Sequence, residues 1–145
     1  MNKRLFLSVV FIGTLVGVSP LLARASRAAT NLRAEIRVAA IHAGLALEMH
    51  ALPLTHLHLH HVINCLVGRH GRQFDPRAGN PCHGLGEGAI PDSRMSPPTV
   101  RMALHDALDD ALAGEQAKTL VRAHHMAFAA RENLLRATQA LPHHH

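Results

Sequence analysis

The sequence predicts an all-α protein: an antiparallel four-helix bundle with a long disulfide-tethered loop between its second and third helices. Apolar residues recur at helical spacing in four segments of the chain. A stretch of almost thirty residues, rich in Gly and Pro, separates the second segment from the third. Aromatic residues make up only 3% of the chain, and the abundant Ala, Leu and Val suit close packing of helices.

The first residues are typical of an export signal. Two basic residues precede an apolar run over 5–18, which is short for a membrane span. Ala23-Arg24-Ala25 has the small-x-small pattern of a cleavage site. We therefore expect a signal peptide at 1–25, a mature domain at 26–145, and a periplasmic or secreted location. A retained membrane anchor is the alternative; after cleavage we expect no stable membrane insertion.

The charge of the predicted mature domain excludes one class of function. Of 15 Lys and Arg residues, three fall in the predicted signal and 12 remain against 10 acids. The chain has no Trp or Tyr to stack on bases, and no basic stripe. We therefore expect no nucleic-acid partner.

The first two helices are separated by a proline. Ser26–Ala51 carries the first apolar stripe, and Pro53 ends this helix and opens the next, because proline is tolerated in a first helical turn. The second helix is expected over Leu54–Val67, with Gly68 as its stop. The first stripe consists of Leu32, Ile36, Ala39, Ala43, Leu47 and His50.

The long loop is expected over Arg69–Pro97. Two cysteines in an exported chain predict one disulfide, Cys65–Cys82, which would tie this loop to the end of the second helix. It closes about 18 residues and contributes roughly 3 kcal/mol in the chain-entropy model. A reduced Cys65 acting as a metal ligand is the competing interpretation.

The last two helices follow the loop. Pro98–Ala113 reads as the third helix, and Gly114 is expected to break it. The fourth helix is expected over Gln116–Leu141, with His124 near the middle of its apolar stripe.

The second helix holds the most unusual stretch of the chain, with four histidines in the six residues from His56 to His61. At about 100° per residue, His58, His61 and Cys65 share one face, whereas His56 and His60 point the other way. The first group is expected to face inward and the second to face solvent.

Histidines on several helices indicate a metal site. The chain has 14 histidines, and 11 remain when the terminal run 143–145, which also resembles a purification tag, is left out. Each predicted helix carries at least one on or beside its core face, as in bundles that hold metals or cofactors between helices. A single core histidine is more often a packing residue. The predicted metal ligands are His42, His58, His61, His105 and His124.

Copper is the favoured ion, because imidazole suits several transition metals and Met49, Met102 and Met126 lie close to histidines in sequence. Haem b held by two histidines is the alternative; a c-type attachment motif is absent from the sequence. The role expected is storage, delivery or sensing. A pH- or metal-responsive interaction protein, and a homodimer, are left open.

Catalysis is not expected. The sequence contains neither Gly-x-Ser-x-Gly nor His-Glu-x-x-His, and His105 with Asp109 forms no recognisable nucleophile and base. We therefore assign no catalytic residues and predict that the protein is not an enzyme.

Overall fold

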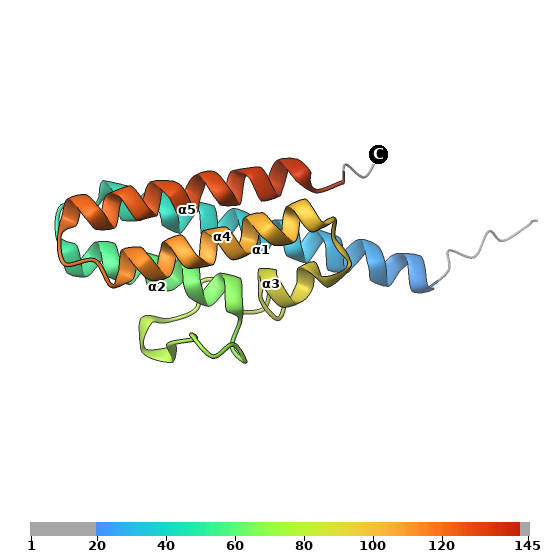
Figure 1. Ribbon diagram of the computed structural model, residues 1–145. Helices are drawn as coiled ribbons and strands as arrows, with labels where there is room; N and C mark the ends of the chain where they lie inside the picture. Colours follow the sequence, from blue (N-terminus) through green and yellow to red (C-terminus); the bar gives the residue numbers. More distant parts are fainter. Residues whose placement is uncertain (1–19, 143–145) are drawn as a thin grey trace, which may run out of the picture.

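The computed structural model describes residues 20–142, with side chains from residue 31 onward, and all regular structure in this range is helical. The predicted all-α class is confirmed. The four long helices are α1 (Pro20–Glu48), α2 (Leu52–Val67), α4 (Pro98–Glu115) and α5 (Leu120–Ala140) (Figure 1). Three short ones lie between α2 and α4: η1 (Pro76–Ala78), α3 (Ala89–Asp92) and η2 (Ser93–Met95).

The long helices lie side by side along a roughly common axis (Figure 1). α1 packs against α2 and α5, and α4 packs against the same two helices. Small side chains on α1 bring the helix backbones close together: Ala39, Ala43 and Ala46 are completely buried. Larger aliphatic residues from the other helices fill the remaining core, including Leu59, Ile63, Leu66, Leu104 and Leu134.

The boundary between α2 and the loop follows the expected chemistry. α2 ends at Val67 and is followed by Gly68, whose φ of 67° lies in the region that favours glycine. A Cβ there would also lie 1.6 Å from the Glu87 carbonyl oxygen, so the segment before α3 can approach only a glycine. α2 starts at Leu52 and has Pro53 in its first turn.

The expected helix break at Gly114 is wrong. α4 continues to Glu115, and Gly114 is buried within its last turn. A Cβ on Gly114 would lie 2.9 Å from Leu59 Cδ1 and 2.9 Å from Met126 Cβ, so the glycine allows α2 and α5 to pack closely here. α5 begins after Thr119, whose side chain accepts a hydrogen bond from Arg122 N, rather than at Gln116.

The disulfide between Cys65 and Cys82 is confirmed, with 5.2 Å between the two Cα atoms. It ties the loop to the last turns of α2, as the sequence predicts. The loop is not wholly irregular, because it contains η1, α3 and η2, and α3 packs against both α1 and α2.

The predicted signal peptide falls mostly on residues 1–19, and the terminal histidines are residues 143–145; both ranges lie outside the described residues. α1 begins at Pro20, upstream of the expected start at Ser26. No helix in the described range is both long and apolar enough to cross a bilayer.

Candidate metal centre

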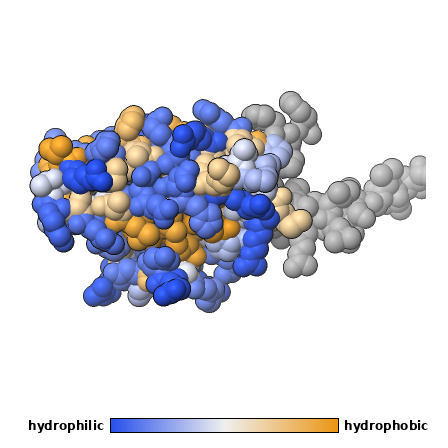
Figure 2. All heavy atoms as spheres, in the orientation of Figure 1, coloured by the Kyte–Doolittle hydropathy of each residue, from blue (hydrophilic) through white to orange (hydrophobic). Residues whose placement is uncertain are grey.

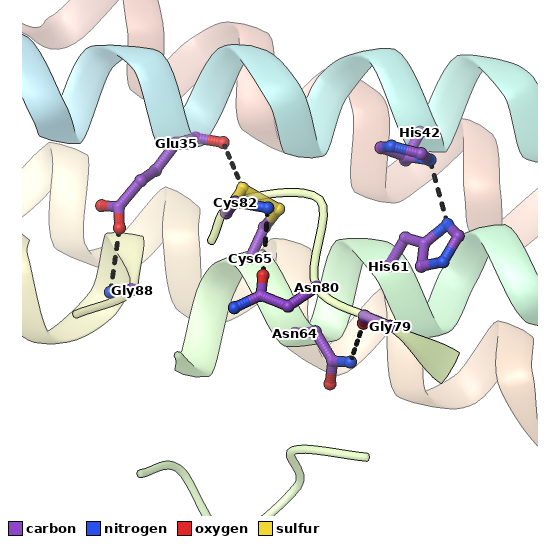
Figure 3. The surroundings of a disulfide bond; sticks show 9 residues. All are labelled: Glu35, His42, His61, Asn64, Cys65, Gly79, Asn80, Cys82 and Gly88. Carbon is purple, nitrogen blue, oxygen red and sulfur yellow. Dashed lines mark hydrogen bonds between the residues drawn. A yellow bond between two sulfur atoms is a disulfide. The ribbon is translucent and has the colours of Figure 1, made fainter. Parts of the chain in front are cut away.

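Three of the five predicted ligands meet at the seam between α1 and α2. His42 comes from α1, and His58 and His61 lie one turn apart on the facing side of α2 (Figure 3 shows His42 and His61). The Nδ1 atom of His42 is 3.2 Å from His58 Nδ1 and 3.2 Å from His61 Nδ1. One ring nitrogen from each histidine lies within 4.8 Å of those of the other two.

These spacings match those of ligands around one ion. Zinc–nitrogen bonds of 2.0–2.1 Å at tetrahedral angles place neighbouring nitrogens about 3.3–3.4 Å apart. The two Nδ1 separations of 3.2 Å are therefore close to those of a coordinated set. An ion at the centre would need only small movements of the rings.

The ring of His61 is oriented by the loop. Its Nε2 lies 2.7 Å from the Ala78 carbonyl oxygen. A carbonyl oxygen can only accept, so Nε2 carries the hydrogen, and the neutral ring then has its lone pair on Nδ1. This nitrogen faces His42, and the carbonyl holds it there in the way that outer partners orient metal-bound histidines.

Hydrogen bonds alone do not satisfy the three facing nitrogens when the rings are neutral. His42 Nδ1 is the shared member of both short contacts, and it can hold either one hydrogen or one lone pair. A lone pair there would face the lone pair of His61. A hydrogen on His42 Nδ1 would be a single donor shared between the Nδ1 atoms of His58 and His61. A cation at the centre accepts all three lone pairs at once.

The surroundings of His42 and His58 favour the neutral form of these two imidazoles. Burial, followed by the neighbouring His61 and His58 rings, lowers the pKa of His42 from 6.5 to about 4. Burial and then His61 also lower the pKa of His58 below its usual value. All three rings are half-buried. Neutral imidazole is the form that binds metals, so His42 and His58 are ready to coordinate at neutral pH.

The structure does not bring His105 and His124 to this cluster. His105 is exposed on α4, where it lines a surface cleft together with Val67, Ile90 and Leu108. Figure 2 shows apolar residues gathered near the centre of a mostly hydrophilic face of the molecule. His124 is half-buried on α5, and its Nε2 lies 3.0 Å from the Met49 carbonyl oxygen. The three-histidine cluster therefore involves α1 and α2 alone.

The expected outward orientation of His56 and His60 is wrong. Both are half-buried against the region where α4 ends. His56 Nε2 lies 3.1 Å from the Ala117 carbonyl oxygen, and His60 Nε2 lies 3.3 Å from Glu115 Oε1. α1 covers one flank of α2 and the end of α4 covers the other, so neither flank is fully open to solvent.

The disulfide rules out Cys65 as a metal ligand, and the loop that it ties down makes a contact with His61 that the sequence did not indicate. Because Cys65 is bonded to Cys82, its sulfur is not a thiolate ligand. The Ala78 carbonyl on His61 was not foreseen, since a backbone group has no sequence signature. Asn64, which holds the same loop, could have been noticed as a polar residue inside the apolar run 62–67.

A comparison of the chain with models of known protein families found no match, and comparisons with curated proteins and with solved structures also found none. Its function is therefore inferred from the fold and from the chemistry of the cluster.

Proposed function

We propose that this protein binds a single transition-metal ion, with copper favoured, through His42, His58 and His61. The observation that carries the proposal is the convergence of three imidazole nitrogens, with His42 Nδ1 at 3.2 Å from both of the others. Lowered pKa values on two of the rings support it, because they keep the ligands unprotonated.

Three protein ligands leave a coordination position for water, a small anion or a group from a partner. Within the described residues, the cluster of His, Cys, Asp and Glu ligands has three members. Structural zinc sites are usually closed by four protein ligands, whereas three-ligand sites keep an exchangeable position. An open position on a half-buried site suits storage, delivery or sensing, and we propose a role of this kind without catalysis.

Copper is favoured by the general order of affinities. Nitrogen sites bind Cu²⁺ more tightly than the other divalent ions of the first transition row, including zinc and nickel. The methionines add little support, since Met102 is 64% exposed on α4, which contributes nothing to the cluster. The haem alternative is less favoured, because a porphyrin must fit between its two axial ligands and nitrogens 3.2 Å apart leave no such space.

We further propose an exported domain, 26–145, that folds as an antiparallel four-helix bundle. The pairwise packing of α1 with α2 and α5, and of α4 with the same two helices, supports the bundle. The signal-like first residues and the disulfide support export, because disulfides persist in oxidising compartments such as the periplasm or the extracellular space.

Competition titrations test the proposal. Metal-free protein ending at Pro142, which removes the terminal histidines, is titrated with Cu²⁺ and separately with Zn²⁺ against a chelator of known affinity. We expect one ion per chain and a loss of affinity of at least about 100-fold in His42→Ala and His61→Ala, because two imidazoles cannot complete the site.

His105→Ala is the matched control. This exposed histidine lies outside the cluster, so its removal should leave the affinity unchanged. Equal, small losses in all three variants would mean that binding reflects histidine content alone and would overturn the proposal. A Soret band in the purified protein would favour haem instead.

A further inference from the structure

The turn that contacts His61 is held at both ends by one side chain. Asn64 Nδ2 donates to the Asp75 carbonyl oxygen at 2.8 Å and to the Gly79 carbonyl oxygen at 2.6 Å (Figure 3 shows the second bond). Asn64 Oδ1 accepts from Asp75 N at 3.0 Å. Between these anchors lies η1, which ends at Ala78, the residue whose carbonyl contacts His61.

Asn64 has no exposed surface, and its amide uses both donor hydrogens and its oxygen on this turn. It lies three residues after His61 on α2, so one helix provides both the ligand and the clamp for the ligand's outer partner. A buried amide that bonds only to a loop is costly unless all its partners stay in place. The amide therefore restricts the turn to one position.

We propose that Asn64 is a positioning residue of the metal centre. By fixing the turn it holds the Ala78 carbonyl on His61 Nε2, which keeps the hydrogen on that nitrogen and directs the Nδ1 lone pair toward the ion. This inference rests on the proposed function, and it adds a residue that does not touch the metal. Loss of such outer partners typically weakens metal binding 10- to 100-fold.

The disulfide makes the role of Asn64 separable from attachment of the loop. Cys82 follows Gly79 by three residues and ties the loop to α2 whether or not Asn64 is present. Removing the Asn64 amide should therefore release the turn near Ala78 without detaching the loop.

The test compares Asn64→Ala with Asn133→Ala in the full chain. Asn133 is also a buried amide, but it donates to Asp110 Oδ2 at 2.8 Å and joins α5 to α4. Both variants lose buried hydrogen bonds and stability. Only Asn64→Ala should weaken zinc affinity, by 10- to 100-fold, when Zn²⁺ is titrated against a chelator.

A second readout follows the imidazole directly. In metal-free protein labelled with ¹⁵N-histidine, NMR should show His61 in the Nε2–H form, with this hydrogen protected from exchange with solvent. In Asn64→Ala the protection should be lost and some Nδ1–H form should appear. A purely structural role for Asn64 would lower stability without changing either signal.

Gly79→Ala provides a variant that leaves the helical core untouched. Gly79 is exposed and has a φ of 86°, so an added Cβ would strain the backbone of the turn. This Cβ would lie 3.8 Å from His61 Nε2. It should reproduce the NMR change and the loss of zinc affinity. Wild-type affinity together with a protected Nε2–H in both Asn64→Ala and Gly79→Ala would overturn this inference and leave the proposed function standing. A wild-type protein that does not bind zinc or copper would overturn the proposed function and this inference with it.

Discussion

Glu35 should make the stability of the protein fall as the pH rises. The residue lies on α1 with no exposed surface. Its Oε1 accepts a hydrogen bond from Gly88 N at 2.9 Å (Figure 3), while Oε2 is buried with no partner in the described structure. Burial first, and the nearby Asp92 carboxylate second, raise the pKa of Glu35 from 4.5 to about 8. The folded protein therefore holds this carboxyl in the protonated form at neutral pH.

The size of the effect follows from linkage. Between pH 4.5 and about 8 the folded state binds this proton and the unfolded state releases it, so the contribution of Glu35 to stability falls as the pH rises. One pKa unit corresponds to about 1.4 kcal/mol. The loss of stability between pH 5 and pH 8 should be on the order of 3 kcal/mol, most of it accumulated by neutral pH.

Glu35→Gln tests this value because glutamine keeps the acceptor for Gly88 N and cannot ionise. The free energy of unfolding is measured by urea titration at pH 5, 6, 7 and 8 on metal-free protein. The variant should gain stability relative to wild type by roughly 3 kcal/mol from pH 5 to pH 8. Histidine titrations occur in both proteins and cancel in the difference. Glu48→Gln, which changes an exposed carboxyl on the same helix, is the control. Parallel pH profiles for wild type and Glu35→Gln would refute the reasoning.

Three further predictions concern the cluster, the disulfide and the core. Zinc affinity should fall mainly as the pH drops from 6.5 toward 4, because the lowered pKa values of His42 and His58 delay competition by protons. The affinity is measured by competition with a chelator, and a fall that is complete by pH 6 would contradict this prediction. Thiol titration of denatured, unreduced protein should find no free thiol, and reduction of Cys65–Cys82 should cost about 3 kcal/mol in urea unfolding; an unchanged midpoint would show that the cross-link does not stabilise the fold. Gly114→Ala should destabilise by about 1–3 kcal/mol through overpacking, and a gain in stability would mean that the helices separate there at no cost.

Much of the fold could be predicted because its signals are local. The apolar stripes located the long helices, and two cysteines in a chain expected to be exported were enough to predict the Cys65–Cys82 pair. Gly114 shows the limit of such signals, since glycine ends a helix in one setting and permits close packing in another. The difference depends on which residues face it from α2 and α5, and helical periodicity does not contain that information.

The candidate site was predictable only in part. The helical phase correctly placed His58 and His61 together. His42 was predicted to join them because it lies on the flank of the first apolar stripe. His105 and His124 have similar sequence contexts, but the rotation and axial position of α4 and α5 take them elsewhere. The role of the Ala78 carbonyl depends on the path of the loop, which its aperiodic sequence does not reveal.

The most direct test of the metal centre is to identify which imidazole nitrogens bind the ion. Protein ending at Pro142 and labelled with ¹⁵N-histidine is titrated with one equivalent of Zn²⁺, a diamagnetic probe, and followed by long-range ¹H–¹⁵N NMR. We predict that the Nδ1 resonances of His42, His58 and His61 shift together to the range of metal-bound nitrogen, while His105 and His124 do not change. Shifts on other histidines, or partial shifts spread over many of them, would contradict the three-histidine centre.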